Sequence, residues 1–175
     1  MSGDIPGIPT EYDGTVFRSR LEARWAAFAN LAGWQWVYEP FDGAGYLPDF
    51  LFTIGDRALL VEVKPVATAE DAKSYLPKIF TGIADLWKKD VVVCGLNPLR
   101  TLYLDFLHSA DDWHTSEAVF SNCPHCHNSL NLHPAHYGYG CTKCGYDKWA
   151  SAPMDGYVDM LWRKAGNDTR WVPAA

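Results

Sequence analysis

The sequence predicts an α/β domain built around a mixed β-sheet. A helical apolar stripe near the N-terminus is followed by three short strands, a second helical segment and two more strands. This order is typical of α/β domains, because helical crossovers join parallel strands whereas short turns join antiparallel ones. With 175 residues, of which 48% are hydrophobic, the chain has enough material for one domain, or for one domain with a small appendage.

The first helix is expected to begin after Thr15 as N-cap and to end at Gly33. Its apolar side chains recur at spacings of three and four residues and form one stripe: Phe17, Leu21, Trp25, Phe28 and Ala32. Glu22 falls at the edge of this stripe, one turn after Arg18. We therefore expect the Glu22 carboxylate to be half-buried.

Three strands are expected after this helix: 34–39, 47–54 and 59–65. A turn at Gly55 and Asp56 joins the last two, so they should be antiparallel neighbours. Asp49 opens the first of this pair, and Glu62 and Lys64 lie at the end of the second. The turn therefore brings one Asp, one Glu and one Lys to the same end of a small sheet.

Glu62 and Lys64 share one face of their strand, because side chains alternate between the two faces. Apolar residues fill the rest of this strand, as in a covered central strand: Leu59, Leu60, Val61 and Val63. A carboxylate and an ammonium in such a strand are costly unless something compensates them. A divalent metal held by Asp49 and Glu62 is one compensation, and a plain ion pair is the other.

The second half of the chain changes in character. The segment 69–89 has helical composition with Pro77 in its middle, which predicts two helices or a kink. Two short strands, 91–94 and 102–106, and a last helix, 155–164, are expected after it. The expected organisation is a flexible N-terminus at 1–14, a main domain at 15–108, an appended module rich in His, Cys, Asn and Gly at 109–150, and a C-terminal helix and tail at 151–175.

Two C-x-x-C pairs in this module predict a structural zinc site with four thiolate ligands: Cys123, Cys126, Cys141 and Cys144. Two disulfides or four unrelated thiols are the alternatives, and nearby histidines offer replacement ligands: His125, His127, His133 and His136. Four cysteines already fill a tetrahedron, so we expect a closed site with no position for catalysis. Cys94, alone in an apolar strand, is expected to be a core residue.

Charge and composition exclude some classes of protein. The formal net charge of -6 argues against a generic, charge-driven nucleic-acid binder, although a local basic face would still allow DNA binding. No apolar stretch is long enough for a transmembrane helix, and residues 1–9 do not resemble a secretory signal. We therefore expect a cytoplasmic protein without a membrane partner, in which clustered cysteines bind metal.

The carboxylates of Asp49 and Glu62 suit Mg²⁺ or Mn²⁺, which prefer hard oxygen ligands. Lys64 would orient a water molecule or stabilise charge in a transition state. Glu22 would complete a second metal site or bind the first ion through water, and Arg18 would steer a phosphate or hold Glu22. The simpler interpretation is an ordinary i,i+4 helix pair between Arg18 and Glu22, with Glu62 and Lys64 solvated on an edge strand.

Several segments together resemble the PD-(D/E)xK nuclease superfamily: 17–22 (FRSRLE), 38–40 (YEP), 46–50 (YLPDF) and 61–65 (VEVKP). The spacing is similar to that of compact members from phages and mobile elements, including the endonuclease subunits of heteromeric transposases. The resemblance covers roughly residues 15–95. It implies a restriction-endonuclease-like αβββαβ core, with Asp49, Glu62 and Glu22 as metal-binding acids and Lys64 as catalytic lysine. Arg18 and Arg20 are the expected substrate contacts.

The resemblance implies a Mg²⁺-dependent nuclease that cleaves DNA, most simply an endonuclease in phage or mobile-element DNA processing or recombination. A protein partner or a homodimer would suit such a role. The alternative is a non-enzymatic zinc-ribbon adaptor that binds nucleic acid through aromatic residues near the cysteines: Tyr137, Tyr139, Tyr146 and Trp149. Those aromatic side chains are equally explained by packing of a small module.

Overall fold

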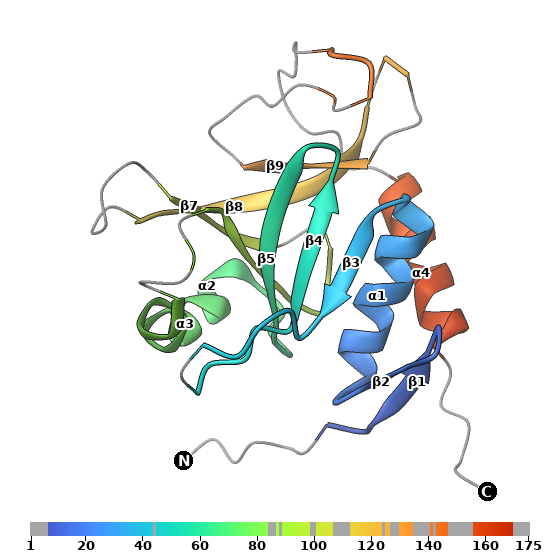
Figure 1. Cartoon of the computed structure of the whole chain (residues 1–175). Coiled ribbons are helices and arrows are strands. Elements are labelled where there is room, and N and C mark those ends of the chain that lie inside the picture. Colours follow the sequence, from blue (N-terminus) through green and yellow to red (C-terminus); the bar gives the residue numbers. More distant parts are fainter. Residues whose placement is uncertain are drawn as a thin grey trace, which may run out of the picture.

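A mixed sheet with helices on both faces forms the protein (Figure 1). The computed structural model describes residues 7–43, 45–83, 87, 89–98, 101–106, 113–123, 125–126, 130–134, 141, 143–146 and 156–169. Within these residues the sheet has seven strands in the order β3-β4-β5-β6-β7-β8-β9. Their bounds are Gln35–Tyr38 (β3), Phe50–Ile54 (β4), Arg57–Val63 (β5), Val91–Cys94 (β6), Thr101–Phe106 (β7), Trp113–Asn122 (β8) and Leu130–Pro134 (β9).

Only the β5–β6 pair in this sheet is parallel, and the other neighbours run antiparallel. The parallel pair needs a crossover, which is supplied by α2 (Ala69–Ala72), the 3₁₀ turn η1 (Lys73–Tyr75) and α3 (Leu76–Ile83). Pro77 is the second residue of α3, so the expected break in this segment falls just before the proline. The expected order of a helix, three strands, helical crossover and strand is therefore present.

Two apolar clusters lie on opposite faces of the sheet. In β6, Val92 and Cys94 belong to the cluster under α1 (Arg20–Ala32) and α4 (Gly156–Asp168), whereas Val91 and Val93 belong to the cluster under α2 and α3. Strand alternation produces this division. Figure 1 shows α1 and α4 side by side on one side of the sheet, with α2 and α3 on the other. The central strands are therefore covered on both faces, as the apolar sequence of β5 predicts.

The first helix begins later than expected. Its N-cap is Ser19, whose hydroxyl accepts a hydrogen bond from the Glu22 amide, and not Thr15. Residues Thr15–Phe17 instead form β2, paired with β1 (Thr10–Tyr12). A serine or threonine at the N-cap can exchange hydrogen bonds with an acidic residue three positions later. Ser19 has Glu22 at that position, which favours Ser19 over Thr15 as the N-cap. Gly33 ends the helix in a left-handed conformation with φ 75°, as expected.

Part of the expected appended module continues the main sheet. Strands β8 and β9 lie within 109–150 and extend the sheet beyond β7. Phe120 of β8 packs against Trp25 of α1, with ring centroids 5.7 Å apart, so it belongs to the main core. The last helix, α4, packs on the same side through Trp162, 4.8 Å from Trp25. None of the described helices is long and apolar enough to span a membrane.

Candidate functional site

Asp49 and Glu62 face each other where the β4–β5 ladder ends. The register pairs Phe50 with Val61, so the next residues outward are Asp49 and Glu62, on the same face of the sheet. Both are buried, with 2% and 4% of their surface exposed. Burying two neighbouring carboxylates is costly unless cations compensate their charge.

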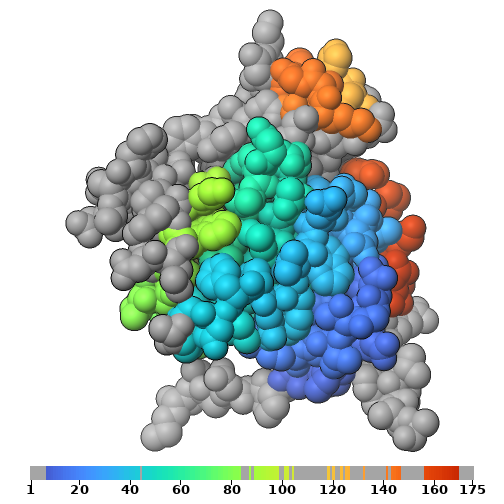
Figure 2. Space-filling model, in the orientation of Figure 1, coloured from blue at the N-terminus to red at the C-terminus, as the bar shows by residue number. Residues whose placement is uncertain are grey.

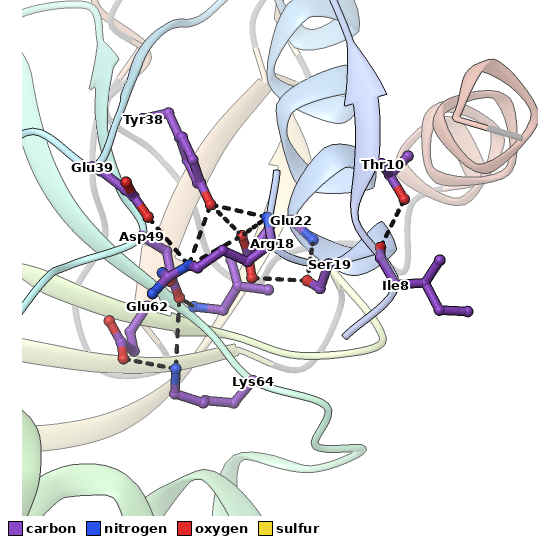
Figure 3. Close-up of polar contacts among 11 residues, drawn as sticks. Ile8, Thr10, Arg18, Ser19, Glu22, Tyr38, Glu39, Asp49, Glu62 and Lys64 are labelled. Atoms are coloured by element: carbon purple, nitrogen blue, oxygen red, sulfur yellow. Dashed lines mark hydrogen bonds and ion pairs between the residues drawn. The ribbon is translucent and has the colours of Figure 1, made fainter. Parts of the chain in front are cut away.

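Lys64 is the first of these cations. Its Nζ lies 2.7 Å from Glu62 Oε1 and 3.6 Å from Asp49 Oδ2, so one ammonium contacts both acids (Figure 3). The Tyr46 hydroxyl donates to Glu62 Oε2 at 2.9 Å, and the Val63 amide donates to Asp49 Oδ2 at 2.6 Å. Each carboxylate is therefore oriented by one neutral donor and one shared cation. The plain ion pair, one of the two compensations expected from the sequence, is present.

Arg18 is the second cation. Its Nη2 donates to Asp49 Oδ1, and its Nε lies 3.2 Å from Glu39 Oε1 and 3.8 Å from Glu22 Oε2 (Figure 3). The Nε also donates to the Tyr38 hydroxyl at 3.3 Å. Arg18 thus connects the N-terminal end of α1 to the Asp49 carboxylate. Its contacts therefore extend beyond the i,i+4 pair with Glu22 that the sequence predicts.

Glu22 is held mainly by the start of its own helix. Its Oε1 accepts from the Ser19 hydroxyl at 2.8 Å, and its Oε2 accepts from the Tyr38 hydroxyl at 2.7 Å and the Arg18 amide at 3.2 Å. Only 7% of Glu22 is exposed, so it is more buried than expected. Glu22 therefore supports the Ser19 cap at the start of α1 and is linked to Asp49 through Arg18.

Burial and charge determine the protonation of the pair. Desolvation, and then the neighbouring Glu62 carboxylate, raise the pKa of Asp49 to about 7. Burial lowers the pKa of Lys64, but the carboxylates of Asp49 and Glu62 outweigh it and the net shift is upward. The two carboxylates therefore favour the charged form of Lys64, whereas burial disfavours the charged form of Asp49.

Asp49 and Glu62 are the two residues at this end of the sheet that could serve as ligands of a divalent cation. Asp49 and Glu62 present carboxylate oxygens that converge on a single cationic atom, Lys64 Nζ. These are hard oxygen ligands of the kind that Mg²⁺ takes one or two at a time. Among the described residues, however, the four cysteines are the only group of three or more possible ligands gathered closely enough to hold a metal. The possible oxygen ligands at this end of the sheet are therefore the carboxylates of Asp49 and Glu62. Glu22 is linked to them through Arg18.

Three residues of the site were not predicted from the sequence, and one predicted residue, Arg20, lies apart from it. Tyr38 contacts Glu22, Glu39 contacts Arg18 and Tyr46 contacts Glu62. All three lie within the motif segments, which is the signal that could have found them. Arg20 is exposed at the first position of α1, and no described hydrogen bond or ion pair connects it to this cluster.

The four predicted cysteine ligands converge at another place. Their sulfur atoms all lie within 4.8 Å of one another, with Cys123 to Cys144 and Cys126 to Cys141 both at 3.7 Å. A tetrahedral site with Zn–S bonds of about 2.3 Å has sulfur separations of about 3.8 Å. All five cysteines of the chain are free thiols, so the alternative of two disulfides is not present. The geometry fits a four-thiolate metal site such as zinc.

Backbone amides support this cysteine cluster. The amides of Lys143 and Cys144 point at Cys141 Sγ at 3.4 Å, and the Cys126 amide points at Cys123 Sγ at 3.5 Å. Although burial acts in the opposite direction, the amide hydrogen bonds lower the pKa of Cys141 to about 6. The amides therefore favour the thiolate form of Cys141, which is the form that binds metal.

His125 does not join the cluster. Its ring stacks on Tyr146, with centroids 5.4 Å apart and planes 8° apart. His127 and His136 lie outside the described residues, as do Tyr137, Tyr139 and Trp149, and only the backbone of His133 is described. Figure 2 shows the described residues of the cysteine loops (orange) at one end of the molecule. The carboxylates lie toward the opposite end of the β4–β5 hairpin (Figure 1).

Comparison with known proteins gives no match, whether to a protein-family model, to a curated protein or to a solved structure.

Proposed function

We propose that the protein is a metal-dependent DNA nuclease of the PD-(D/E)xK type, with a restriction-endonuclease-like core. The single observation that carries this proposal is the buried pair of facing carboxylates, Asp49 and Glu62, contacted by one lysine. The element order from α1 to β6 and the motif segments are consistent with such a core. An ion pair needed only for stability would be served equally well by apolar residues at these positions.

In this proposal Asp49 and Glu62 would hold Mg²⁺ or Mn²⁺. The bound ion would polarise the scissile phosphate and lower the pKa of its water ligand. Tyr46 and the Val63 amide keep the two carboxylates oriented by hydrogen bonds. Lys64, which contacts both carboxylates, would orient the attacking water or stabilise the charge that develops on the phosphate. Glu22 positions Arg18 at the edge of the site.

The cysteine cluster has a structural role in the same proposal. Four thiolates fill the tetrahedron of a zinc ion, so the site is closed to substrate. It also lies toward the opposite end of the β4–β5 hairpin from the carboxylates (Figure 1). We assign zinc to the stability of the chain beyond β8 rather than to the reaction.

Cleavage of a panel of labelled DNAs tests the proposal. The panel contains single-stranded, linear duplex, nicked, flapped and four-way junction DNA, each with Mg²⁺, Mn²⁺ or EDTA and with the zinc-loaded full chain. We expect metal-dependent cleavage that is lost in Asp49→Asn and Asp49→Ala. The matched control is Asp56→Asn, the same change at an exposed position of the β4–β5 turn. Cleavage that persists in the Asp49 variants and in excess chelator would falsify the proposal.

A non-enzymatic nucleic-acid adaptor is the second candidate. The stacked rings of His125 and Tyr146 beside the cysteines favour it, because a flat aromatic surface can stack on an unpaired base. Binding of single-stranded DNA that weakens in His125→Ala, without turnover under any divalent cation, would support the adaptor. Metal-dependent turnover lost in Asp49→Asn would exclude it as the sole function.

A further inference from the structure

Arg18 and a divalent cation compete for the same carboxylate. We propose that Arg18 is an exchangeable counter-ion of Asp49: a divalent cation displaces its guanidinium, which then binds a phosphate of the substrate. This inference rests on the proposed function and adds to it a coupling between cation binding and phosphate binding.

The two cations that contact Asp49 differ in how easily they can leave. Lys64 follows β5 directly, its side chain is 21% exposed, and it is also bonded to Glu62 at 2.7 Å. Arg18 lies between β2 and α1, and its side chain is 51% exposed. Rotation of the Arg18 side chain needs no change in any helix or strand, so Arg18 is the cation that moves.

The guanidinium of Arg18 is divided between two sets of partners. Its Nη2 holds Asp49, while its Nε holds the Tyr38 hydroxyl at 3.3 Å and the Glu39 carboxylate at 3.2 Å. Because the guanidinium has five donors, the contact through Nη2 can be released while the contacts through Nε remain. Tyr38 and Glu39 therefore retain Arg18 at the site after Asp49 is lost to a metal. Once Nη2 is released, the two terminal amino groups can contact a phosphate in a bidentate manner.

Electrostatic repulsion couples the binding of a divalent cation at Asp49 to the release of Arg18. Asp49 Oδ2 is already bonded to the Val63 amide and contacted by Lys64, so Oδ1 is the oxygen on which Arg18 and an incoming cation meet. A divalent cation and a guanidinium on one buried carboxylate repel each other strongly. Cation binding and the release of Arg18 are therefore linked, and by reciprocity the phosphate and the cation each raise the affinity for the other.

Titration calorimetry of the zinc-saturated full chain with Mn²⁺ provides the first test. We expect Arg18→Ala and Arg18→Gln to bind Mn²⁺ about tenfold more tightly than the wild type, because the competing charge is gone. The matched control is Arg163→Ala, which removes an exposed arginine whose ion pair is with Asp159 on α4. The control should keep wild-type affinity, and its melting temperature and those of the Arg18 variants are compared to confirm folding.

Binding of a short labelled DNA duplex provides the second test. Ca²⁺ is used in place of Mg²⁺. It should raise the affinity of the wild type for DNA about tenfold over a sample without divalent cation, and Arg18→Gln should lose most of this gain. The inference is overturned if the Arg18 variants bind Mn²⁺ no more tightly than the wild type, or if they gain as much DNA affinity from Ca²⁺. Those results leave the nuclease proposal standing, provided that Asp49→Asn abolishes Mn²⁺ binding. If Asp49→Asn binds Mn²⁺ normally, both proposals fail.

Discussion

The ring of Tyr46 packs directly against Gly82 of α3, and a Cβ placed on Gly82 would lie 2.2 Å from Tyr46 Cγ. The same tyrosine donates its hydroxyl to Glu62. A glycine on the crossover helix therefore makes room for the residue that orients a buried carboxylate.

Gly82→Ala should destabilise the protein. Alanine favours a helix by about 1 kcal/mol over glycine, but displacing the Tyr46 ring should cost about 1–3 kcal/mol and reverse that gain. Urea unfolding measures the difference. Gly156→Ala is the matched control, since a Cβ at Gly156 meets nothing within 4 Å and stability should be unchanged or slightly higher. A Gly82→Ala variant more stable than the wild type would contradict this packing.

Tyr46→Phe should affect the site more than the fold. The ring that packs on Gly82 remains, while Glu62 Oε2 loses its hydrogen bond, at a cost to stability of about 1–2 kcal/mol. Glu62 is then less well oriented, so we expect Mn²⁺ affinity to fall about tenfold, as is typical when a partner of a metal ligand is removed. Tyr12→Phe removes a hydroxyl bonded to Asn30, away from the carboxylates, and should leave Mn²⁺ binding unchanged. Equal Mn²⁺ affinities for Tyr46→Phe and the wild type would exclude this role.

The stability of the protein without divalent cation should depend on pH through Asp49. Its pKa is raised by folding from 3.8 to about 7, so the folded state holds the proton more tightly than the unfolded state. This contribution therefore stabilises the fold below about pH 4 and is lost as the pH rises to about 7. Comparing urea unfolding of the wild type and Asp49→Asn at about pH 6 and about pH 8 isolates it. We expect the variant to gain on the wild type as pH rises, and a constant difference would refute the raised pKa.

Removing one cysteine of the cluster should remove its metal. Cys126→Ser should reduce bound zinc from about one ion per chain to almost none, since a structural zinc needs its four ligands. Its melting temperature should then match that of the chelator-treated wild type, because metal binding contributes directly to folding. Cys94→Ala, which changes a buried cysteine outside the cluster, should keep the zinc. Full zinc content in Cys126→Ser, measured by elemental analysis, would contradict the assignment.

Local sequence patterns predicted much of the fold. Alternation in β5 placed Glu62 and Lys64 on one face, and the turn at residues 55–56 brought Asp49 opposite Glu62. The start of the first helix was predicted wrongly, at Thr15 instead of Ser19. The reason is that Thr15–Phe17 pairs with β1, a competition between strand and helix that helical periodicity does not detect.

Local sequence patterns therefore suffice to predict which acids and lysine share one end of the sheet, and which four cysteines converge. Those features depend on strand period, turn position and short spacing, which are properties of the local chain. The contacts that hold the acids depend instead on tertiary packing: Arg18 contacts Asp49, 31 residues away in sequence, and Tyr46 contacts Glu62, 16 residues away. Such contacts depend on how α1 and the loop before β4 pack against the sheet. Because many distant groups could neutralise a buried carboxylate, the packing of the whole chain selects the ones that do.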